Sequence, residues 1–343
     1  MGVKLKDLIE PKTIEIKSLK DKVLAVDAHN MLYQFLTTIR QRDGTPLTNS
    51  EGKITSHLNG LFYRCTSFME QGLKLVFVYD GVPPKLKAQE NAARREKKML
   101  AQTQYKAAQD EGDIDAMKKF ASRTAYLSKD MIAESKKLLH HLGIPVVQAP
   151  SEGEAQAAFM THHDAYAVVS QDFDSLLSGC TRVVRNLSVE GKRKKAGTLS
   201  YTSIEPEMIE LNAVLKSLNI TQDQLITMGI LIGTDYNNGG IPGIGPKKAL
   251  KLVKEEKDTH ALFAKLEWNK HFNVDWKEIV DTIKNMPVTK EYKLQWKKPN
   301  IDELRAFLLE QNFTAERIDQ KIKTLAENTG RNTQTGLNQW SAK

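Results

Sequence analysis

The chain has 343 residues, enough for one large domain or two ordinary domains with a substantial buried core. Hydrophobic residues make up 40% and charged residues 27%, which excludes a largely disordered chain. Its two cysteines, Cys65 and Cys180, cannot form a disulfide framework or a four-cysteine zinc site. We find no signal-peptide core and no bilayer-length apolar run, so we expect neither secretion nor membrane insertion. The net charge of +8 suits a polyanionic partner.

Short β-branched runs alternate with longer segments of helical pattern. Because these runs are apolar on both faces, they indicate buried strands of a parallel sheet. The sequence therefore predicts an α/β fold with a mostly parallel central sheet and helices on both faces. The predicted strands are residues 22–27, 74–80, 144–147, 165–170 and 182–187.

The segment 85–142 is long, charged and almost free of glycine and proline. Six basic and two acidic residues give the stretch Lys85–Lys98 a local charge of +4. Pro84 is tolerated at a helix start, so we predict one helix there and further helices from about Asp113 and Ser128. A solvated helical cover is the plain interpretation. The length and sign of the segment favour a helical arch over a negatively charged ligand.

Beyond Tyr201 the chain is predicted to be helical, with helices over 203–218, 221–233 and 243–256. A second basic region follows Gly243. After Glu327 the sequence becomes polar and rich in glycine, asparagine and threonine, which predicts a flexible tail.

Carboxylates follow the predicted strands and one helix. Ligands of open parallel sheets bind outside the carboxyl ends of the strands, so we expect these acids at one edge. Gathered there, they would repel one another unless cations held them, and oxygen ligands in such number suit Mg²⁺ or Mn²⁺ rather than zinc. Taken singly, each acid could be an ordinary turn residue, and Ser151 with Glu154 has the pattern of a helix capping box. The set is Asp27, Asp80, Glu152, Glu154, Asp172, Asp174 and Asp235.

A Gly-x-Gly turn precedes the helix predicted at 243–256. Such a turn leaves backbone N–H groups and the positive end of the helix dipole pointing outward, which favours phosphate binding. A simple inter-helix turn is the alternative. The preceding helix at 221–233 favours a helix-hairpin-helix, also called helix-two-turn-helix, that contacts a DNA backbone without reading bases. Its candidate contact residues are Gly243, Gly245, Lys247 and Lys248.

Five spaced motifs together resemble one family, the flap endonucleases of the XPG-type structure-specific 5′ nucleases. The resemblance covers nearly the whole chain in the family's order, and the short tail is most similar to archaeal members. The motifs are Val26-Asp27-Ala28, Phe77–Gly81 with Pro83-Pro84, Ala149–Ala155, Asp172–Leu176, and Gly233–Tyr236 followed by Gly243–Lys247.

The resemblance implies a 5′ flap endonuclease with accompanying 5′-3′ exonuclease activity, which cleaves branched DNA at the single-strand/duplex junction. It also implies a place in Okazaki-fragment maturation and long-patch base excision repair. Two Mg²⁺ ions would be bound, with Mn²⁺ a possible substitute. Asp27, Asp80, Glu152 and Glu154 would hold the first, and Asp172, Asp174 and Asp235 the second. The alternatives are a related 5′ exonuclease or bubble nuclease, or a non-enzymatic DNA-binding scaffold.

Further roles are carried over from the family to matching positions. Lys87 and Arg94 would be catalytic residues of a helical gateway that activates the scissile phosphate. Tyr33 would stack on a base near the cut. Thr55 and Arg64 would belong to a pocket for a one-nucleotide 3′ flap.

The tail resembles a motif that binds the sliding clamp (PCNA). Gln334, Leu337 and Trp340 fit it, whereas Ser341 replaces the second aromatic residue, so we expect weakened clamp binding. Without the clamp we expect a monomer, cytoplasmic if archaeal and otherwise nuclear. The expected organisation is two nuclease halves, a C-terminal helical part and a tail, at residues 1–99, 117–259 (with the helix-hairpin-helix at 221–259), 260–327 and 328–343.

Overall fold

The computed structural model describes residues 3–187, 191–194 and 201–338. The chain forms two compact units, and each is assembled from three stretches of sequence. This division differs from the consecutive segments expected from the sequence. The first unit contains Met1–Ala28, Val78–Arg94 and Gln148–Tyr292, and the second contains His29–Phe77, Arg95–Val147 and Lys293–Lys343.

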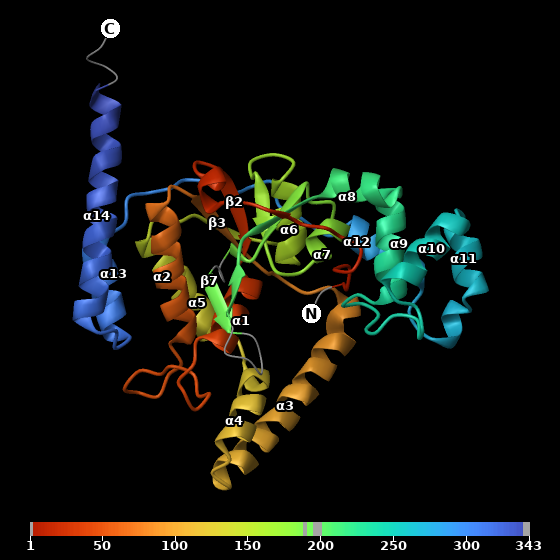
Figure 1. Cartoon of the computed structure of the whole chain (residues 1–343), viewed down its shortest axis with the longest axis horizontal. Helices are drawn as coiled ribbons and strands as arrows, with labels where there is room; N and C mark the ends of the chain where they lie inside the picture. The colour runs from red at the N-terminus through yellow and green to blue at the C-terminus, as the bar shows by residue number, and fades with distance from the viewer. Residues whose placement is uncertain (1–2, 188–190, 195–200, 339–343) are drawn as a thin grey trace. The chain divides into compact units, whose positions relative to one another are not determined.

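The larger of the two sheets is mixed and has seven strands (Figure 1). In spatial order its strands are β1 (Lys12–Thr13), β9 (Glu207–Glu210), β6 (Arg182–Arg185), β5 (Ala167–Val169), β2 (Val23–Asp27), β3 (Lys74–Tyr79) and β4 (Val146–Gln148). Strands β2, β5 and β6 pair in parallel, with Leu24 opposite Ala167 and Val168 opposite Val183. Except for the half-buried Val23, their apolar residues are almost fully buried. The predicted α/β fold with a parallel core is confirmed.

The prediction of a purely helical chain beyond Tyr201 was wrong. Strand β8 (Tyr201–Ile204) pairs with β7 (Gly191–Lys194) in a separate two-stranded ribbon. Strand β9 then pairs antiparallel with both β6 and β1. Because β6 supplies backbone partners and buries Met208 and Ile209, four residues with little strand pattern become extended. The helix begins only at Leu211.

Helices of the first unit pack on this sheet and extend beyond it. α6 packs on β2 and β5, α7 on β6, and α8 on β9. α9 and α10 pack against each other, which is the predicted helix pair. Thr221 caps α9 through a reciprocal bond with Gln224. The helices are α6 (Gly153–Met160), α7 (Asp174–Leu177), α8 (Leu211–Leu218), α9 (Gln222–Ile232), α10 (Pro246–Glu255), α11 (Thr259–Lys265) and α12 (Trp276–Lys284).

The second unit is a helical assembly in which α2 packs on α5 and α14, and α13 packs on α5 and α14. α14 remains helical as far as Asn338, so part of the stretch expected to be a tail is a helix. No helix among the described residues has the length and apolarity needed to cross a membrane. The helices are α1 (Ala28–Thr38), α2 (Ser56–Glu70), α4 (Ile114–Ala121), α5 (Lys129–His141), α13 (Ile301–Glu310) and α14 (Ala315–Asn338).

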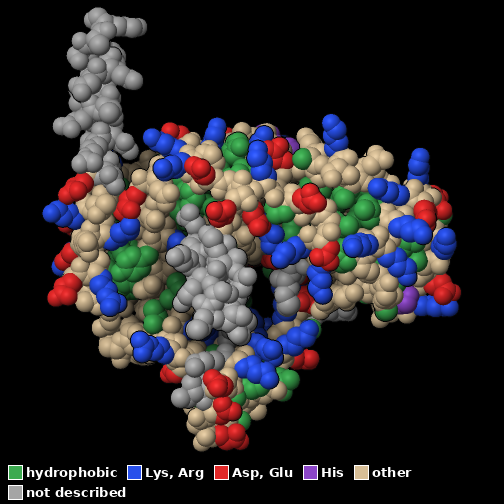
Figure 2. Space-filling model, in the orientation of Figure 1, with side chains coloured by type: hydrophobic (Ala, Val, Ile, Leu, Met, Phe, Trp, Pro, Cys, Tyr) green, Lys and Arg blue, Asp and Glu red, His purple; other side chains and the backbone are tan. Residues whose placement is uncertain are grey.

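α3 (Ala88–Asp110) contains residues of both units and follows a short 3₁₀ turn, Lys85–Lys87. A turn at Gly112 joins it to α4, as the arch prediction requires. Lys and Arg side chains gather along α3, whereas acidic side chains lie at the far turn (Figure 2). Along the sequence, basic residues crowd Arg94–Lys98 and acids crowd Asp110–Asp115. The hairpin is therefore basic at its start and acidic at its tip.

Candidate active site

The seven predicted metal ligands all lie in the first unit. Asp27 is the last residue of β2, and Asp80 directly follows β3. Glu152 and Glu154 stand at the start of α6, and Asp174 opens α7. Asp172 and Asp235 lie just beyond β5 and α9 respectively. Asp235 follows a helix, whereas the other six lie at or just after the ends of strands, where a parallel sheet places its ligands.

The predicted capping box at Ser151 was wrong. Helix α6 has Glu152, not Ser151, as its N-cap residue, and no side chain caps it. The Ser151 hydroxyl instead donates to the carbonyl of Val82 (2.8 Å), because Gly81 and Val82 pair with the backbone at Pro150 and Ser151. Glu154 therefore has no capping role in the structure and is available for another one.

Burial and the charges of neighbouring acids raise the pKa values of three carboxyl groups of this set. Burial raises the pKa of Glu154 well above its usual value, and the nearby charge of Asp174 raises it further. Burial also raises the pKa of Asp174 to about 6; the Val3 N–H opposes this shift and Asp172 adds to it. The pKa of Glu152 is raised in the same direction, chiefly by burial. The charge of Asp27 also raises the pKa of Glu154, and the charges of Asp80 and Asp235 raise that of Glu152.

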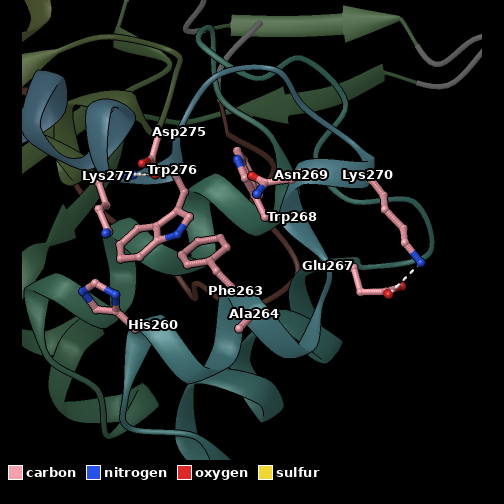
Figure 3. A pocket seen from close by; sticks show the side chains of 10 residues that line it. All are labelled: His260, Phe263, Ala264, Glu267, Trp268, Asn269, Lys270, Asp275, Trp276 and Lys277. Atoms are coloured by element: carbon pink, nitrogen blue, oxygen red, sulfur yellow. Dashed lines mark hydrogen bonds and ion pairs between the residues drawn. The ribbon is translucent and has the colours of Figure 1, made fainter.

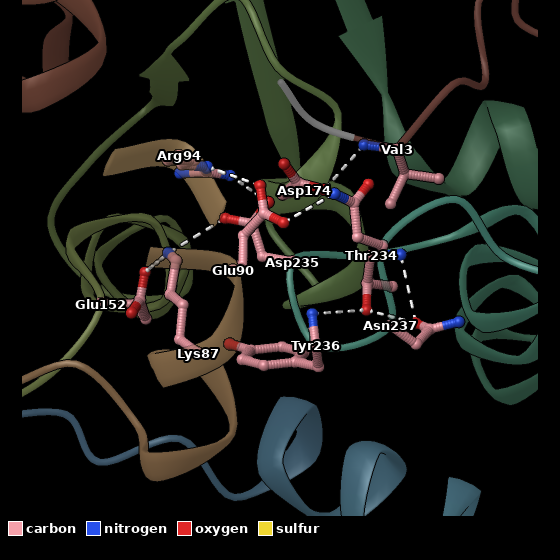
Figure 4. A network of polar contacts seen from close by, with 11 residues as sticks. Val3, Lys87, Glu90, Arg94, Glu152, Asp174, Thr234, Asp235, Tyr236 and Asn237 are labelled. Carbon is pink, nitrogen blue, oxygen red and sulfur yellow. Dashed lines mark hydrogen bonds and ion pairs between the residues drawn. The ribbon is translucent and has the colours of Figure 1, made fainter. Parts of the chain in front are cut away.

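Two cations from the region of the predicted gateway reach into this cluster (Figure 4). The Lys87 ammonium pairs with Glu152 Oε2 and lies 3.1 Å from Asp235 Oδ2. The Arg94 guanidinium donates from Nη2 to Asp235 Oδ1 at 2.6 Å. Burial alone would lower the pKa of Lys87, but the acids around it, Glu152 first, raise it above its usual value. The structure thus brings both predicted catalytic cations onto predicted metal ligands.

Backbone N–H groups hold two of the carboxylates in place. Gly153 donates its N–H to Asp80 Oδ1 at 2.7 Å. A Cβ at position 153 would lie 2.7 Å from the same oxygen, so glycine permits this approach. The Val3 N–H donates to Asp174 Oδ1 at 2.9 Å, which fixes the start of α7.

The chemistry of this donor set fits hard divalent cations. Every donor is a carboxylate oxygen, and the acids raise one another's pKa, as expected for a cluster that a cation would stabilise. As the described side chains stand, no group of three or more histidines, cysteines or acids is placed to hold a metal ion, so the fit is one of ligand type and not of spacing. Lys87 and Arg94 instead balance part of the negative charge.

Among the residues of this network that sequence reasoning missed are Glu90 and Asn238. Glu90 is 7% exposed, and its two oxygens accept from Arg94 Nε and Asn238 Nδ2, both at 2.7 Å. The spacing of Glu90 and Arg94, four residues apart on a helix, is a signal that could have identified the pair. Nothing in the sequence identifies Asn238 as its second partner.

The other residues predicted to contact DNA belong to elements outside the carboxylate cluster. Tyr33, on α1 in the second unit, accepts a hydrogen bond from Lys98 Nζ at 3.1 Å, and the same ammonium lies 5.8 Å from the Tyr126 ring centroid. Thr55 is the N-cap residue of α2 and is buried, and Arg64 lies half-buried farther along α2. The structure does not test the roles expected for them.

The Gly-x-Gly turn is open to solvent. Gly243 has a φ of +77°, which favours glycine, whereas Gly245 has an ordinary φ of −95°. A Cβ at Gly245 would meet no atom within 4 Å, so neither conformation nor packing within the chain requires glycine there. Pro246 begins α10, and Lys247 and Lys248 are exposed beside it. The glycine thus leaves space for an external group.

An aromatic cluster supports the helices that follow this turn. Phe263 of α11 stacks on Trp276 of α12 with ring centroids 4.6 Å apart, and Trp268 packs edge-on against Phe263. Together with His260 and Lys277 they line a hollow of about 550 Å³ (Figure 3). The cluster holds α11 against α12.

Of the predicted clamp-binding residues, Gln334 and Leu337 lie in the last turns of α14, and Trp340 lies outside the described residues.

Comparison with known proteins gives consistent matches. The family model for the XPG N-terminal domain matches residues 1–101, and the model for the XPG I-region matches residues 143–235. Flap endonuclease 1 of Pyrococcus abyssi is 48% identical over 345 residues, covering 100% of this chain and 99% of that protein.

Solved structures agree with these sequence matches. The flap endonuclease-1 of Methanococcus jannaschii matches with a TM-score of 0.76 at 40% identity, over 96% of this chain and all of that one. The catalytic core of Rad2, solved in complex with a DNA substrate, matches with a TM-score of 0.67 at 25% identity, over 92% of this chain and 96% of that one. The chain therefore belongs to the flap endonuclease 1 family of XPG-type nucleases, as its motifs predicted.

Proposed function

We propose that this chain is a metal-dependent, structure-specific 5′ flap endonuclease with accompanying 5′-3′ exonuclease activity. It hydrolyses one phosphodiester bond of branched DNA at the junction between the single-stranded flap and the duplex. The observation that carries the proposal is the contact of Lys87 and Arg94 with the carboxylate cluster. Two cations placed among acids that would hold metal ions would meet a phosphate bound at those ions.

Bound Mg²⁺ ions, two per site, would activate water and stabilise the leaving oxygen. The seven carboxylates are the residues that would hold them, and Mn²⁺ could substitute. Lys87 and Arg94 supply positive charge to the non-bridging oxygens of the scissile phosphate, where charge develops in the transition state. Arg94 is suited to this because its planar fork can donate two parallel hydrogen bonds to a phosphate.

The Gly-x-Gly turn holds the duplex. Backbone N–H groups at the start of α10 and the exposed lysines beside them contact phosphates, and the missing side chain at Gly245 lets the backbone come close. These contacts fix the position of the DNA and carry no sequence preference. Basic side chains of α3 contact the single strand, and Tyr33 stacks on a base.

The same proposal sets the biological context. Cleavage of 5′ flaps serves Okazaki-fragment maturation and long-patch base excision repair. The sliding clamp would bind through Gln334, Leu337 and Trp340. The identity to archaeal relatives supports a cytoplasmic enzyme. In the absence of the clamp the enzyme is a monomer.

A cleavage assay with a labelled 5′-flap duplex tests the proposal. We expect cutting at the junction with Mg²⁺, loss of cutting in EDTA, and loss in the Asp172→Ala variant. Undiminished cutting in EDTA or by this variant would overturn the proposed chemistry. Nicked and bubble duplexes run in parallel decide the substrate, because a preference for either one over the flap favours a related 5′ exonuclease or bubble nuclease.

A further inference from the structure

Glu90 is a buried carboxylate on a highly charged helix, α3, whose other charged residues are exposed or half-buried. The residue is 7% exposed, whereas Glu96 on the same helix is exposed. Removing a carboxylate from water is costly unless hydrogen bonds and opposite charge compensate for it. The partners of Glu90 therefore indicate what its burial achieves.

The two oxygens of Glu90 bind two different elements of the first unit. Oε1 accepts from Arg94 Nε, one turn farther along α3, at 2.7 Å. Oε2 accepts from Asn238 Nδ2 at 2.7 Å. Asn238 belongs to the loop after α9 that also carries Asp235, so one carboxylate joins the start of α3 to the loop of a predicted metal ligand.

That loop is held firmly in place. Asn237 is 3% exposed, donates to the carbonyl of Ile230 at 2.7 Å, and accepts from the Thr234 hydroxyl at 2.7 Å. The loop therefore offers Glu90 a fixed anchor, and Glu90 in turn holds the guanidinium of Arg94 through its Nε.

Contacts on both sides set the orientation of the guanidinium. Nε donates to Glu90 and Nη2 donates to Asp235, so two of its five N–H donors are engaged in the described contacts. A long arginine side chain without such restraints would sample many rotamers before meeting a phosphate. Misplacement of a reacting or stabilising group by about 1 Å can cost roughly a hundredfold in rate.

We propose that Glu90 is a positioning residue, which orients Arg94 toward the scissile phosphate and ties the start of α3 to the Asp235 loop through Asn238. This rests on the proposed function, in which Arg94 acts on that phosphate. It predicts that Glu90 contributes to the rate of the chemical step through Arg94 alone, and that it contributes little to DNA affinity.

A double-mutant cycle on a labelled 5′-flap duplex tests this. Single-turnover rates are measured with Mg²⁺, and Kd is measured in EDTA so that the substrate stays intact. We expect Arg94→Ala to slow cleavage by about 10²–10³-fold. We expect Glu90→Ala to slow it by about 10–100-fold without changing Kd. The double variant should be no slower than Arg94→Ala, because Glu90 then has nothing to orient.

Conservative and control variants separate positioning from a general structural role. Glu90→Gln keeps a side-chain acceptor for Arg94 Nε and should recover most of the rate. Asn238 is exposed, so Asn238→Ala should disturb the fold little and leave Glu90 in place. It should slow cleavage several-fold and have no added effect in the Arg94→Ala background. If Glu90→Ala does not fold, as judged by its Tm, these two variants carry the test. Glu96→Ala, an exposed acid on the same helix, should cut at the wild-type rate.

Three results would overturn the inference. They are a wild-type rate for Glu90→Ala, an effect on Kd in place of the rate, and a full additional loss in the double variant. If Arg94→Ala itself cuts at the wild-type rate, the proposed role of Arg94 is wrong and that of Glu90 falls with it. If Arg94→Ala is slow while Glu90→Ala is not, the proposed function stands and only the positioning role is rejected.

Discussion

The carboxylate cluster and the Gly-x-Gly turn belong to the same unit but differ in whether their charged groups are buried and paired within the chain. In the cluster, negative charges are partly buried and are balanced within the chain by Lys87 and Arg94. At the turn, Lys247 and Lys248 are exposed, and among the described residues neither pairs with a carboxylate. The turn even leaves space where a side chain could stand.

In the proposed function the cluster acts in the chemical step and the turn binds DNA, and the arrangement of charge in each region suits its role. Charges that are buried and paired have fixed positions, which catalysis requires. Charges that are exposed and unpaired contribute affinity for an anion and respond to salt. Changes in the cluster should therefore alter the rate, and changes in the turn should alter the affinity.

The largest effect is expected in the cluster. Lys87→Ala should lower the single-turnover rate of flap cleavage by about 10²–10³-fold, because it removes a cation from the reacting phosphate. DNA affinity should change little. Lys216→Ala removes an exposed lysine on α8 that has no place in the proposed site; it is the control and should keep nearly the full rate. A loss of affinity with an unchanged rate would place Lys87 among the gripping residues instead.

A smaller effect is expected from the turn. Lys247→Ala combined with Lys248→Ala should weaken flap binding by about tenfold, and the slope of log Kd against log salt should fall by about two. Fluorescence anisotropy at several salt concentrations measures both. Lys254→Ala with Lys257→Ala, near the other end of α10, is matched in charge and should change the slope less. Equal slopes for the two pairs of variants would argue against phosphate binding localised at the turn.

Two glycine substitutions in the turn distinguish a requirement for open space beside the backbone from a requirement for a positive φ. Gly245→Ala should weaken DNA binding several-fold while leaving Tm unchanged, since its φ is ordinary and nothing in the chain fills the space. Gly243→Ala should destabilise the fold by about 1–2 kcal/mol, because its φ is positive. A drop in Tm for Gly245→Ala would mean that the open space serves folding.

The smallest effect concerns stability. Glu154→Gln removes one charge from a group of mutually repelling acids, so we expect it to raise the Tm of the metal-free protein. An increase of about 3 °C corresponds to roughly 1 kcal/mol for a domain of 150–250 residues. The shift in Tm caused by added Mg²⁺ should shrink at the same time. A lower Tm without metal would show that Glu154 is stabilised by its neighbours.

Much of the fold could be predicted because local patterns were strong. The five predicted strands are apolar on both faces, and each was found close to its expected limits. The antiparallel β9 was missed because Glu207–Glu210 has no local strand signal and becomes extended only by pairing with β6. The capping box failed for a related reason, since a distant carbonyl, that of Val82, engages the Ser151 hydroxyl.

The site was predictable in composition and not in detail. The positions of the acids follow from strand ends and could be read from the sequence, and their roles as metal ligands stay a prediction. The contacts of Lys87 with Glu152 and of Arg94 with Asp235 join residues 65 and 141 positions apart, which no local pattern specifies. The anchor of Glu90 on Asn238, 148 positions away, is of the same kind.

The hydrogen bond from Val3 to Asp174 has a practical consequence for handling the protein. It places Val3 beside a predicted metal ligand. A purification tag fused ahead of Met1 would lie only a few residues from that carboxylate, and a histidine tag there would bring competing metal-binding groups with it. Quantitative metal titrations should therefore use protein from which such a tag has been cleaved.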